Sequence, residues 1–319
     1  MPELPEMETY RVQLNERIAG RSVTEVIIGR EKSINVPAET FRMNHIGCHI
    51  SIRNGYAGAA RTAAAIGAKA FQYFPKNPRG LSVKEWDRTD ALKCAGVCRE
   101  FGIISIAHTA YATNLAAAAS IREATIRSLR NDLDIAEACG SLGVVVHFGK
   151  WHRGGDPLEG YKLILASIND VLSDWDGGAL LLIENQAGEG GGAGMTFEEL
   201  ASIRKLAEKP EKIGFCLDTC HLFASGVWDG RNTEAMLEQA RALGFLTQLK
   251  AMHLNDSMYA CGSRRDRHAG IGSGEIGLAA ITELLRSLDL QGVPVVLETP
   301  VPAGSSHREE IALVQSLAR

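Results

Sequence analysis

The chain has 319 residues, of which 45% are hydrophobic and 23% are charged, a composition typical of a globular protein. No stretch approaches the ~18 to 20 apolar residues of a membrane span, and the acidic, polar start of the chain lacks the apolar core of a signal peptide. The formal net charge of −4 argues against a protein that coats nucleic acid, and seven scattered cysteines favour a reducing cytoplasm over a disulfide framework.

Residues 1–45 differ from the rest of the chain, because they carry mixed charges and a single strand-like run at 23–28. From residue 46 onward short apolar runs recur. Their length and nearly continuous hydrophobicity predict strands that are buried on both faces. The runs lie at 46–51, 70–74, 103–108, 144–148, 180–185, 213–218, 249–255 and 293–299.

Helix-like segments separate these runs. Examples lie at 56–68, 128–143 and 233–245, and Thr196 with Glu199 predicts a capping box that opens another helix. Eight strands alternating with eight helices favour an α/β fold, a (β/α)₈ TIM barrel, over an open doubly wound sheet, which alternates in the same way. We therefore expect an N-terminal appendage, residues 1–45, and a barrel domain, residues 46–319.

Ionisable side chains stand at the ends of six successive predicted strands. These residues are His108, His147, Glu184, Asp218, His253 and Glu298. The carboxyl ends of barrel strands converge on one face, where such groups are costly to bury unless they are paired or bound to metal. Three further candidates, His221, Asp266 and His268, lie in the loops that follow. Imidazoles and carboxylates without thiolates predict a catalytic site for zinc or manganese. His49, at the end of the first run, is expected beside the ligands without binding a metal, and His45, His152 and His307 are expected to be ordinary surface residues.

The motifs FPKNPRG, IENQAGEG, LDTCHLFASG, MHLNDS and GSRRDRHAGIGSGEIG resemble those of the endonuclease IV family, over residues 46 to about 300. This family consists of metal-dependent apurinic/apyrimidinic endonucleases, TIM barrels with three zinc ions. The resemblance implies a first zinc on His108, His147 and Glu184, a second on Glu184, Asp218, His253 and Glu298, and a third on His221, Asp266 and His268. Glu184 is thereby the bridging ligand and the expected catalytic residue.

By the same resemblance, Arg79 and Tyr111 match family residues that contact DNA beside the lesion. A basic rim on the same face is expected from Lys76, Lys150, Arg153, Arg264, Arg265 and Arg267. The chain departs from the family pattern at Gly80, Thr109, Ala112, Phe148 and Lys150. These departures affect lesion recognition and leave the metal ligands intact.

The first residues, MPELPEMETYR, resemble the start of formamidopyrimidine-DNA glycosylase and endonuclease VIII. In that family the amine of the residue at Pro2 attacks the sugar, and the residue at Glu3 assists by proton transfer. Only about 45 residues of that longer family are present. We therefore interpret this segment as a gene-fusion remnant.

The sequence thus predicts a zinc-dependent repair endonuclease that cuts 5′ to abasic sites to give a 3′-hydroxyl and also cleans blocked 3′ ends. Its expected partner is double-stranded DNA, and no membrane partner is expected. We expect the protein to act as a monomer, in association with the nucleoid. Manganese is an alternative at one or more sites. Two other functions remain open: a metal-dependent sugar isomerase or epimerase on a related barrel, and a non-enzymatic DNA-damage binding protein.

Overall fold

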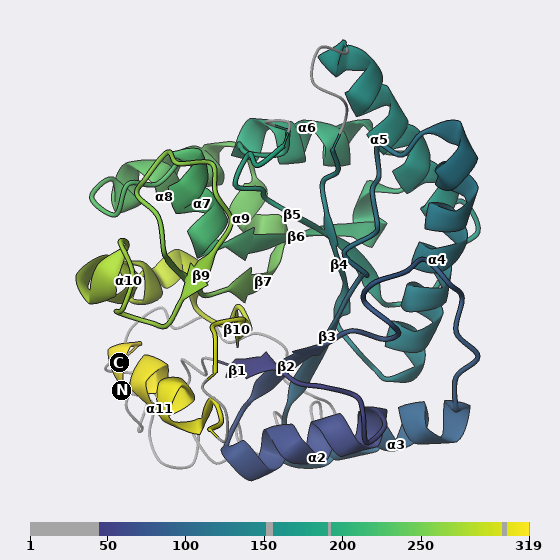
Figure 1. Cartoon of the computed structure of the whole chain (residues 1–319), viewed down its shortest axis with the longest axis horizontal. Helices are drawn as coiled ribbons and strands as arrows, with labels where there is room; N and C mark the ends of the chain where they lie inside the picture. The colour runs from purple at the N-terminus through teal and green to yellow at the C-terminus, as the bar shows by residue number, and fades with distance from the viewer. Residues whose placement is uncertain (1–44, 151–155, 191–192, 302–304, 319) are drawn as a thin grey trace, which may run out of the picture. The chain divides into compact units, whose positions relative to one another are not determined.

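Eight parallel strands close into a barrel in the order β1-β10-β7-β6-β5-β4-β3-β2 (Figure 1). The strands are β1 (Ile46–His49), β2 (Ala70–Tyr73), β3 (Ile104–His108), β4 (Gly143–His147), β5 (Leu180–Glu184), β6 (Ile213–Asp218), β7 (Leu249–His253) and β10 (Val295–Leu297). Each coincides with a predicted apolar run, and the predicted TIM barrel is confirmed. A separate two-stranded antiparallel sheet joins β8 (Asp256–Ser257) and β9 (His268–Ala269).

This computed structural model describes residues 45–150, 156–190, 193–301 and 305–318. The chain divides into one unit at Met1–Met43 and another at Asn44–Arg319. The predicted run at 23–28, Pro2, Glu3, His152 and Arg153 lie outside the described residues. Within the described ranges, no helix combines the length and apolar character needed to cross a membrane.

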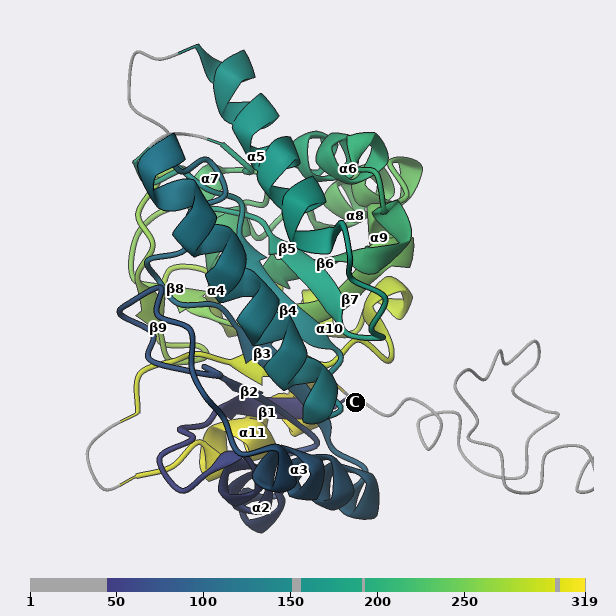
Figure 2. The same cartoon turned by 90° about the vertical axis from the view of Figure 1, so that its right-hand side faces the viewer.

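Helices cover the outer side of the barrel, and in Figure 2 α4 and α5 lie across β3, β4 and β5. The helices are α2 (Tyr56–Ile66), α3 (Arg88–Phe101), α4 (Ala119–Ala138), α5 (Pro157–Leu172), α6 (Phe197–Leu206), α7 (Thr219–Ser225), α8 (Thr233–Ala242), α9 (Phe245–Gln248), α10 (Gly277–Leu285) and α11 (Arg308–Leu317). Short 3₁₀ turns occur at η3 (Pro210–Lys212) and η4 (Leu288–Leu290). The capping box of Thr196 and Glu199 opens α6, as predicted.

Three helices differ from their predicted bounds. The helices α2 and α8 begin as predicted but end two and three residues earlier, because Gly67 and Gly244 adopt left-handed backbone angles just beyond them. The helix predicted at 128–143 is α4, which starts nine residues earlier and ends at Ala138, before the left-handed Gly140. The strand that follows it therefore begins at Gly143.

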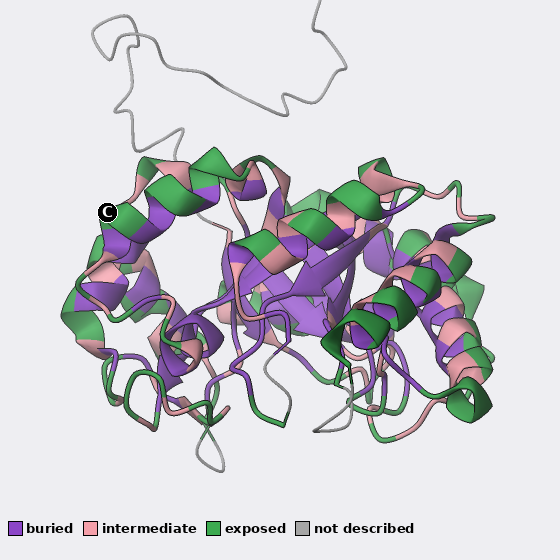
Figure 3. Ribbon diagram, turned by 90° about the horizontal axis from the view of Figure 1, so that it is seen from above, coloured by how far each residue is buried: buried purple, intermediate pink, exposed green. Residues whose placement is uncertain are grey.

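The core has two layers. Inside the barrel one residue from each of six strands forms a small apolar cluster, consisting of Ile106, Val145, Leu182, Cys216, Ala251 and Val296. Outside it, the other strand faces pack against the buried sides of the helices, which Figure 3 shows in purple beneath green exposed sides. All seven cysteines are free thiols, and six of them are buried.

Lys76 does not belong to a basic rim, and that expectation is wrong. It follows β2, is 5% exposed, and its Nζ lies 2.8 Å from Oδ1 of Asp132 on α4 and donates to the carbonyl of Ser128 at 2.5 Å. Burial raises the pKa of the fully buried Asp132 carboxyl to about 6 despite the neighbouring ammonium group, and burial lowers the pKa of Lys76. This buried pair attaches the loop after β2, which also contains Arg79, to α4.

Lys76→Met should destabilise the fold by about 3–5 kcal/mol, because it leaves the Asp132 carboxyl buried without its partner. Urea unfolding measures the loss. Lys76→Met combined with Asp132→Leu should recover most of the stability, and Lys93→Met, at an exposed position of α3, should stay within about 0.5 kcal/mol of the parent. A loss below about 1 kcal/mol in the single variant would contradict this account of the pair.

Candidate metal centre

The candidate site lies at the carboxyl ends of the barrel strands. His108, His147, Glu184, Asp218 and His253 are the last residues of β3, β4, β5, β6 and β7, and Glu298 directly follows β10. The strand register sets His147 beside Glu184 and Asp218 beside His253. The parallel barrel therefore brings together side chains that are up to 190 residues apart in the chain.

The short sequence Asp218-Thr-Cys-His221 turns strand into helix at the site. Asp218 ends β6 and caps α7, and its Oδ1 accepts from the backbone N–H of His221 at 2.7 Å. This bond satisfies a free donor in the first turn of α7. It also fixes the His221 imidazole three residues after the carboxylate, inside the same buried region.

Glu184 occupies the centre of the site and is 1% exposed. Its Oε2 lies 3.5 Å from Nε2 of His108 and 3.2 Å from Nε2 of His147. Its Oε1 lies 3.0 Å from Nδ1 of His253 and 3.4 Å from Nδ1 of His221. The two oxygens of one carboxylate thus face two different pairs of imidazoles.

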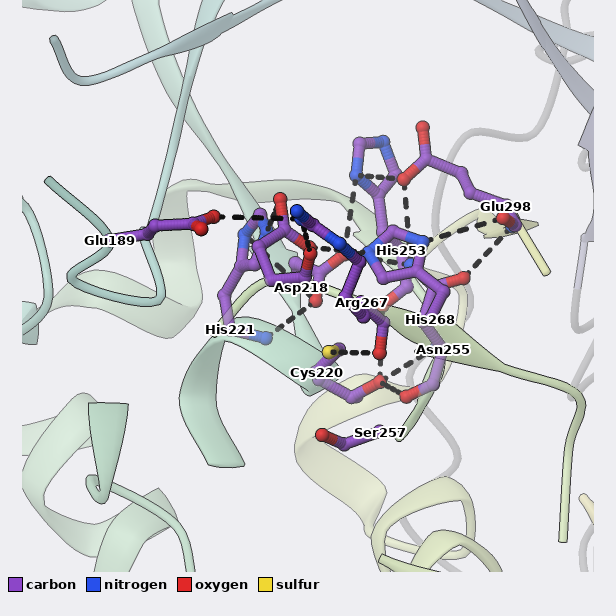
Figure 4. A network of polar contacts seen from close by, with 12 residues as sticks. Glu189, Asp218, Cys220, His221, His253, Asn255, Ser257, Arg267, His268 and Glu298 are labelled. Atoms are coloured by element: carbon purple, nitrogen blue, oxygen red, sulfur yellow. Dashed lines mark hydrogen bonds and ion pairs between the residues drawn. The ribbon is translucent and has the colours of Figure 1, made fainter. Parts of the chain in front are cut away.

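A second carboxylate, Asp266, joins two histidines on the other side of the site. Its Oδ2 lies 3.2 Å from Nε2 of His221, and its Oδ1 lies 3.2 Å from Nε2 of His268. Glu298 contacts His253, with Oε2 3.3 Å from Nδ1. Figure 4 shows His221, His253, His268, Asp218 and Glu298 converging from separate elements. All nine residues suggested by the sequence therefore lie in one region.

The loop that carries Asp266 and His268 closes on the buried carboxylate of Asp256. This side chain accepts from five backbone N–H groups, those of Ser257, Gly272, Gly274, Ile276 and Gly277, at 2.8 to 3.4 Å. His268 also lies on β9, in register with Ser257 on β8. The Asp256 carboxylate thus accepts hydrogen bonds from both ends of this loop.

Four sets of three side chains have ligand atoms within 4.8 Å of one another. The sets are His108, His147 and Glu184; Glu184, Asp218 and His253; Asp218, His221 and His268; and Cys220, Asp266 and His268. The first set coincides with the expected first zinc site, and the second contains three of the four residues expected at the second. The expected third set, His221, Asp266 and His268, is not one of the four: Asp218 stands in place of Asp266 in one set, and Cys220 stands in place of His221 in another.

Two buried atoms fit a bound cation. Oε2 of Glu184 lies 3.2 Å from Nε2 of His147, and Nε2 of His268 lies 3.2 Å from Oδ1 of Asp266, but neither contact has the geometry of a hydrogen bond, and neither atom has another hydrogen-bond partner within the part of the chain that the structure describes. A buried polar atom without a partner is costly, and a metal ion would satisfy both atoms. Imidazole and carboxylate donors suit zinc, so the residues present fit this ion.

The titration of the site reflects the mixture of buried acids and imidazoles. Burial alone would lower the pKa of His268, but its contact with Asp266 and the charge of Asp218 raise that pKa to about 9. Burial would raise the pKa of Glu298, whereas the charge of His253 lowers it to about 2. Both shifts favour the charged form of the group, so a metal that binds His268 must displace a proton.

A cavity of about 360 Å³ opens above this cluster and is lined by His108, His147, Glu184, His221, Asp266, His268 and Glu298, together with His49, Phe74, Tyr111, Thr299 and His307. A larger groove of about 720 Å³ runs along α8 and α10, but its described lining includes none of the nine candidates. The smaller cavity therefore gives access to the candidate metal ligands.

Tyr111 stands at the edge of this cavity. Its side chain is 69% exposed, and its ring meets Phe74 edge to face with centroids 5.1 Å apart. The backbone N–H of Tyr111 donates to the carbonyl of Pro78 at 2.9 Å, so the loops of Tyr111 and Arg79 are joined. Arg79 is exposed as well. Both side chains are available to a large ligand that approaches the cavity.

Three residues at the site were missed or misjudged from the sequence. Gln72, fully buried on β2, contacts both His253 and Glu298. Asn255 donates to Oδ2 of Asp218 at 2.7 Å, and its Oδ1 accepts from the backbone N–H of Glu298. His307, expected outside the site, lines the cavity. A single polar residue within the apolar run AFQYF was the available signal for Gln72.

The model of the xylose isomerase-like TIM barrel family matches residues 60–317. A probable endonuclease 4 from Symbiobacterium thermophilum is 43% identical over 273 residues, which are 85% of this chain and 99% of that protein. The crystal structure of endonuclease IV from Thermus thermophilus has a TM-score of 0.74 and 30% identity, and the match covers 86% of this chain and 97% of that one.

The fold and site define a metal-dependent hydrolase on a TIM barrel. Within that class, the chain belongs to the endonuclease IV family. A 3-keto-D-glucoside 4-epimerase from E. coli is similar in fold alone, with a TM-score of 0.61 and 15% identity over 86% of this chain and all of that one.

A second family model, that of the formamidopyrimidine-DNA glycosylase N-terminal domain, matches residues 1–54. The resemblance of the first residues to this family is thereby confirmed. The match extends past the expected boundary near residue 45 and includes β1, which pairs with β2 and β10 in the barrel.

Proposed function

We propose that this chain is a zinc-dependent apurinic/apyrimidinic endonuclease that hydrolyses the phosphodiester 5′ to an abasic site in duplex DNA and leaves a 3′-hydroxyl. The proposal includes removal of blocked 3′ ends and action as a monomer. The observation that carries it is the position of Glu184, whose two oxygens face separate pairs of histidines.

In this proposal the nine side chains hold three ions. His108, His147 and Glu184 hold the first, Glu184, Asp218, His253 and Glu298 the second, and His221, Asp266 and His268 the third. Such ions activate water at neutral pH and neutralise charge on phosphate oxygens. Glu184, shared between two sets, keeps their donor atoms in one geometry and acts as the catalytic carboxylate.

The charge of the site supports an anionic substrate. Four carboxylates, Glu184, Asp218, Asp266 and Glu298, carry four negative charges, and three divalent ions would carry six positive charges. The loaded site with neutral imidazoles then has a net charge of about +2, which favours binding of a phosphodiester.

A sugar isomerase or epimerase is the main alternative on this fold. Such enzymes need only one or two metals, and His221, Asp266 and His268 would then have no function. Here Asp266 contacts both His221 on α7 and His268, and five hydrogen bonds to Asp256 hold the loop that carries Asp266 and His268. This arrangement favours the endonuclease.

The purified protein should nick a duplex that contains one synthetic abasic site, on its 5′ side. Strong chelation should abolish the activity, and Zn²⁺ or Mn²⁺ should restore part of it. Glu184→Gln keeps the size of the side chain but removes its charge, so turnover should fall by about 10³-fold or more. Gel analysis of end-labelled DNA measures both effects.

DNA binding by Glu184→Gln should remain near the parent level, because phosphate contacts come from other residues. Two results would reject the proposed function: cleavage by the metal-free protein, or β-elimination products in place of a 3′-hydroxyl. A parent-like rate for Glu184→Gln would reject the assignment of this residue alone.

Arg79→Ala and Tyr111→Ala should each reduce the preference for abasic over intact duplex by about 1–3 kcal/mol, because wedge and stacking contacts are lost. Competition binding with the two duplexes measures the preference. Metal content should not change in either variant. Leu206→Ala, at an exposed position at the end of α6, is the matched control and should bind as the parent does. A variant that loses metal but keeps the preference for abasic DNA would show that the residue acts in metal binding and not in DNA recognition.

The N-terminal segment, residues 1–45, is proposed to be a fusion remnant without glycosylase activity. It is too short to build a pocket and core of its own. A truncated chain that starts at Met43 should fold and cleave abasic DNA, because it keeps every described residue, including His45, whose carbonyl accepts from the N–H of Val295 at 2.7 Å. Borohydride trapping on an oxidised-base duplex should yield no adduct. An adduct that Pro2→Gly abolishes would instead show a second activity.

A further inference from the structure

Gln72 is a polar side chain inside the barrel. It lies on β2, is fully buried, and pairs in register with Ile106, a member of the inner apolar cluster. Register partners point to the same side of a sheet, so Gln72 also points into the barrel. Its amide lies directly beneath the candidate metal centre, and a buried amide must find hydrogen-bond partners there.

The amide of Gln72 joins two of the candidate ligands. Its Oε1 lies 2.7 Å from Nε2 of His253, and its Nε2 donates to Oε1 of Glu298 at 2.6 Å. The nitrogen of the amide faces Glu298, and its oxygen faces His253. An amide oxygen can only accept, so the hydrogen in the contact with His253 lies on Nε2 of the imidazole.

This arrangement determines which nitrogen of His253 is available to a metal. Nε2 donates its hydrogen to Gln72, which leaves Nδ1 as the ligand atom. Nδ1 lies 3.0 Å from Oε1 of Glu184, 3.3 Å from Oε2 of Glu298 and 3.9 Å from Oδ2 of Asp218. All three oxygens belong to the second proposed set. Because Gln72 also binds Oε1 of Glu298, the other oxygen of that carboxylate is directed toward the same point.

The other histidines are oriented differently. Nδ1 of His108 lies 2.8 Å from the carbonyl of Thr109, Nδ1 of His221 lies 2.9 Å from the carbonyl of Asn185, and Nδ1 of His268 lies 3.4 Å from the carbonyl of Glu298. In each of these three the backbone holds Nδ1, and Nε2 faces a carboxylate. His253 has the opposite orientation, and a side chain holds it.

We propose that Gln72 is a positioning residue of the metal centre, which selects Nδ1 of His253 and Oε2 of Glu298 as the ligand atoms of one ion. This inference rests on the proposed function, since it concerns the second zinc site. Gln72 itself contacts neither the ion nor the substrate.

The test is zinc affinity, measured on the full chain by competition with a chromophoric chelator, with bound zinc counted by elemental analysis. Gln72→Met removes the hydrogen bonds to His253 and Glu298, together with the contact of 3.3 Å between Nε2 of Gln72 and Nδ1 of His49, at nearly constant volume. We expect one zinc ion to bind 10- to 100-fold more weakly, the usual effect of losing a partner that orients a ligand, and the other ions to bind as in the parent.

Tyr73→Phe is the matched control on the same strand. Tyr73 is the next residue, points to the outer side, and its hydroxyl lies 2.9 Å from Oγ of Ser141, so the variant also loses one buried hydrogen bond. It should bind zinc as the parent does. Equal affinity in Gln72→Met and the parent, or equal weakening in Gln72→Met and Tyr73→Phe, would overturn the inference.

If Gln72→Met fails to fold, Gln72→Asn tests the inference in its place. It keeps the amide but is one methylene shorter, so it cannot reach both His253 and Glu298, and zinc should again bind more weakly. Parent-like zinc affinity in Gln72→Asn would overturn the inference. A parent chain that binds no zinc would reject the proposed function itself, which is a different result from a parent and a variant that bind zinc equally.

Discussion

The structure of the site depends on one buried carboxylate among imidazoles. Glu184 is nearly inaccessible to water, and four histidines lie within 3.5 Å of its oxygens. An isolated buried carboxylate would be strongly destabilising, so its neighbours must supply positive charge as protons or metal ions. The barrel meets this requirement because the last residues of neighbouring parallel strands meet at one level.

Local structure then adjusts the individual groups. Asp218 caps α7 and so fixes His221, and backbone carbonyls hold Nδ1 of His108 and His221. These are bonds that the main chain makes as it leaves each strand.

Much of this could be predicted from the sequence, because buried parallel strands are largely apolar and an ionisable residue marks the end of several of them. His108, Glu184 and Asp218 are the last residues of their strands. Long-range pairing could not be predicted. Lys76 reads as a surface cation, and only the packing of the loop after β2 against α4 brings it to Asp132, 56 positions later. The helix ends were misplaced because a glycine can continue or end a helix, and its backbone angles decide which.

The loop closed by Asp256 is tied to several parts of the fold. Asp266 and His268 lie between Asp256 and the glycines that its carboxylate binds. The same segment is bound to α7, where the backbone N–H groups of Gly262 and Arg264 donate to the carbonyls of Phe223 and Ala224, and to α11, where Glu310 accepts from the N–H of Ile271. The two side chains of this loop are therefore held in place before any ligand arrives, and a preorganised site loses little conformational freedom on binding.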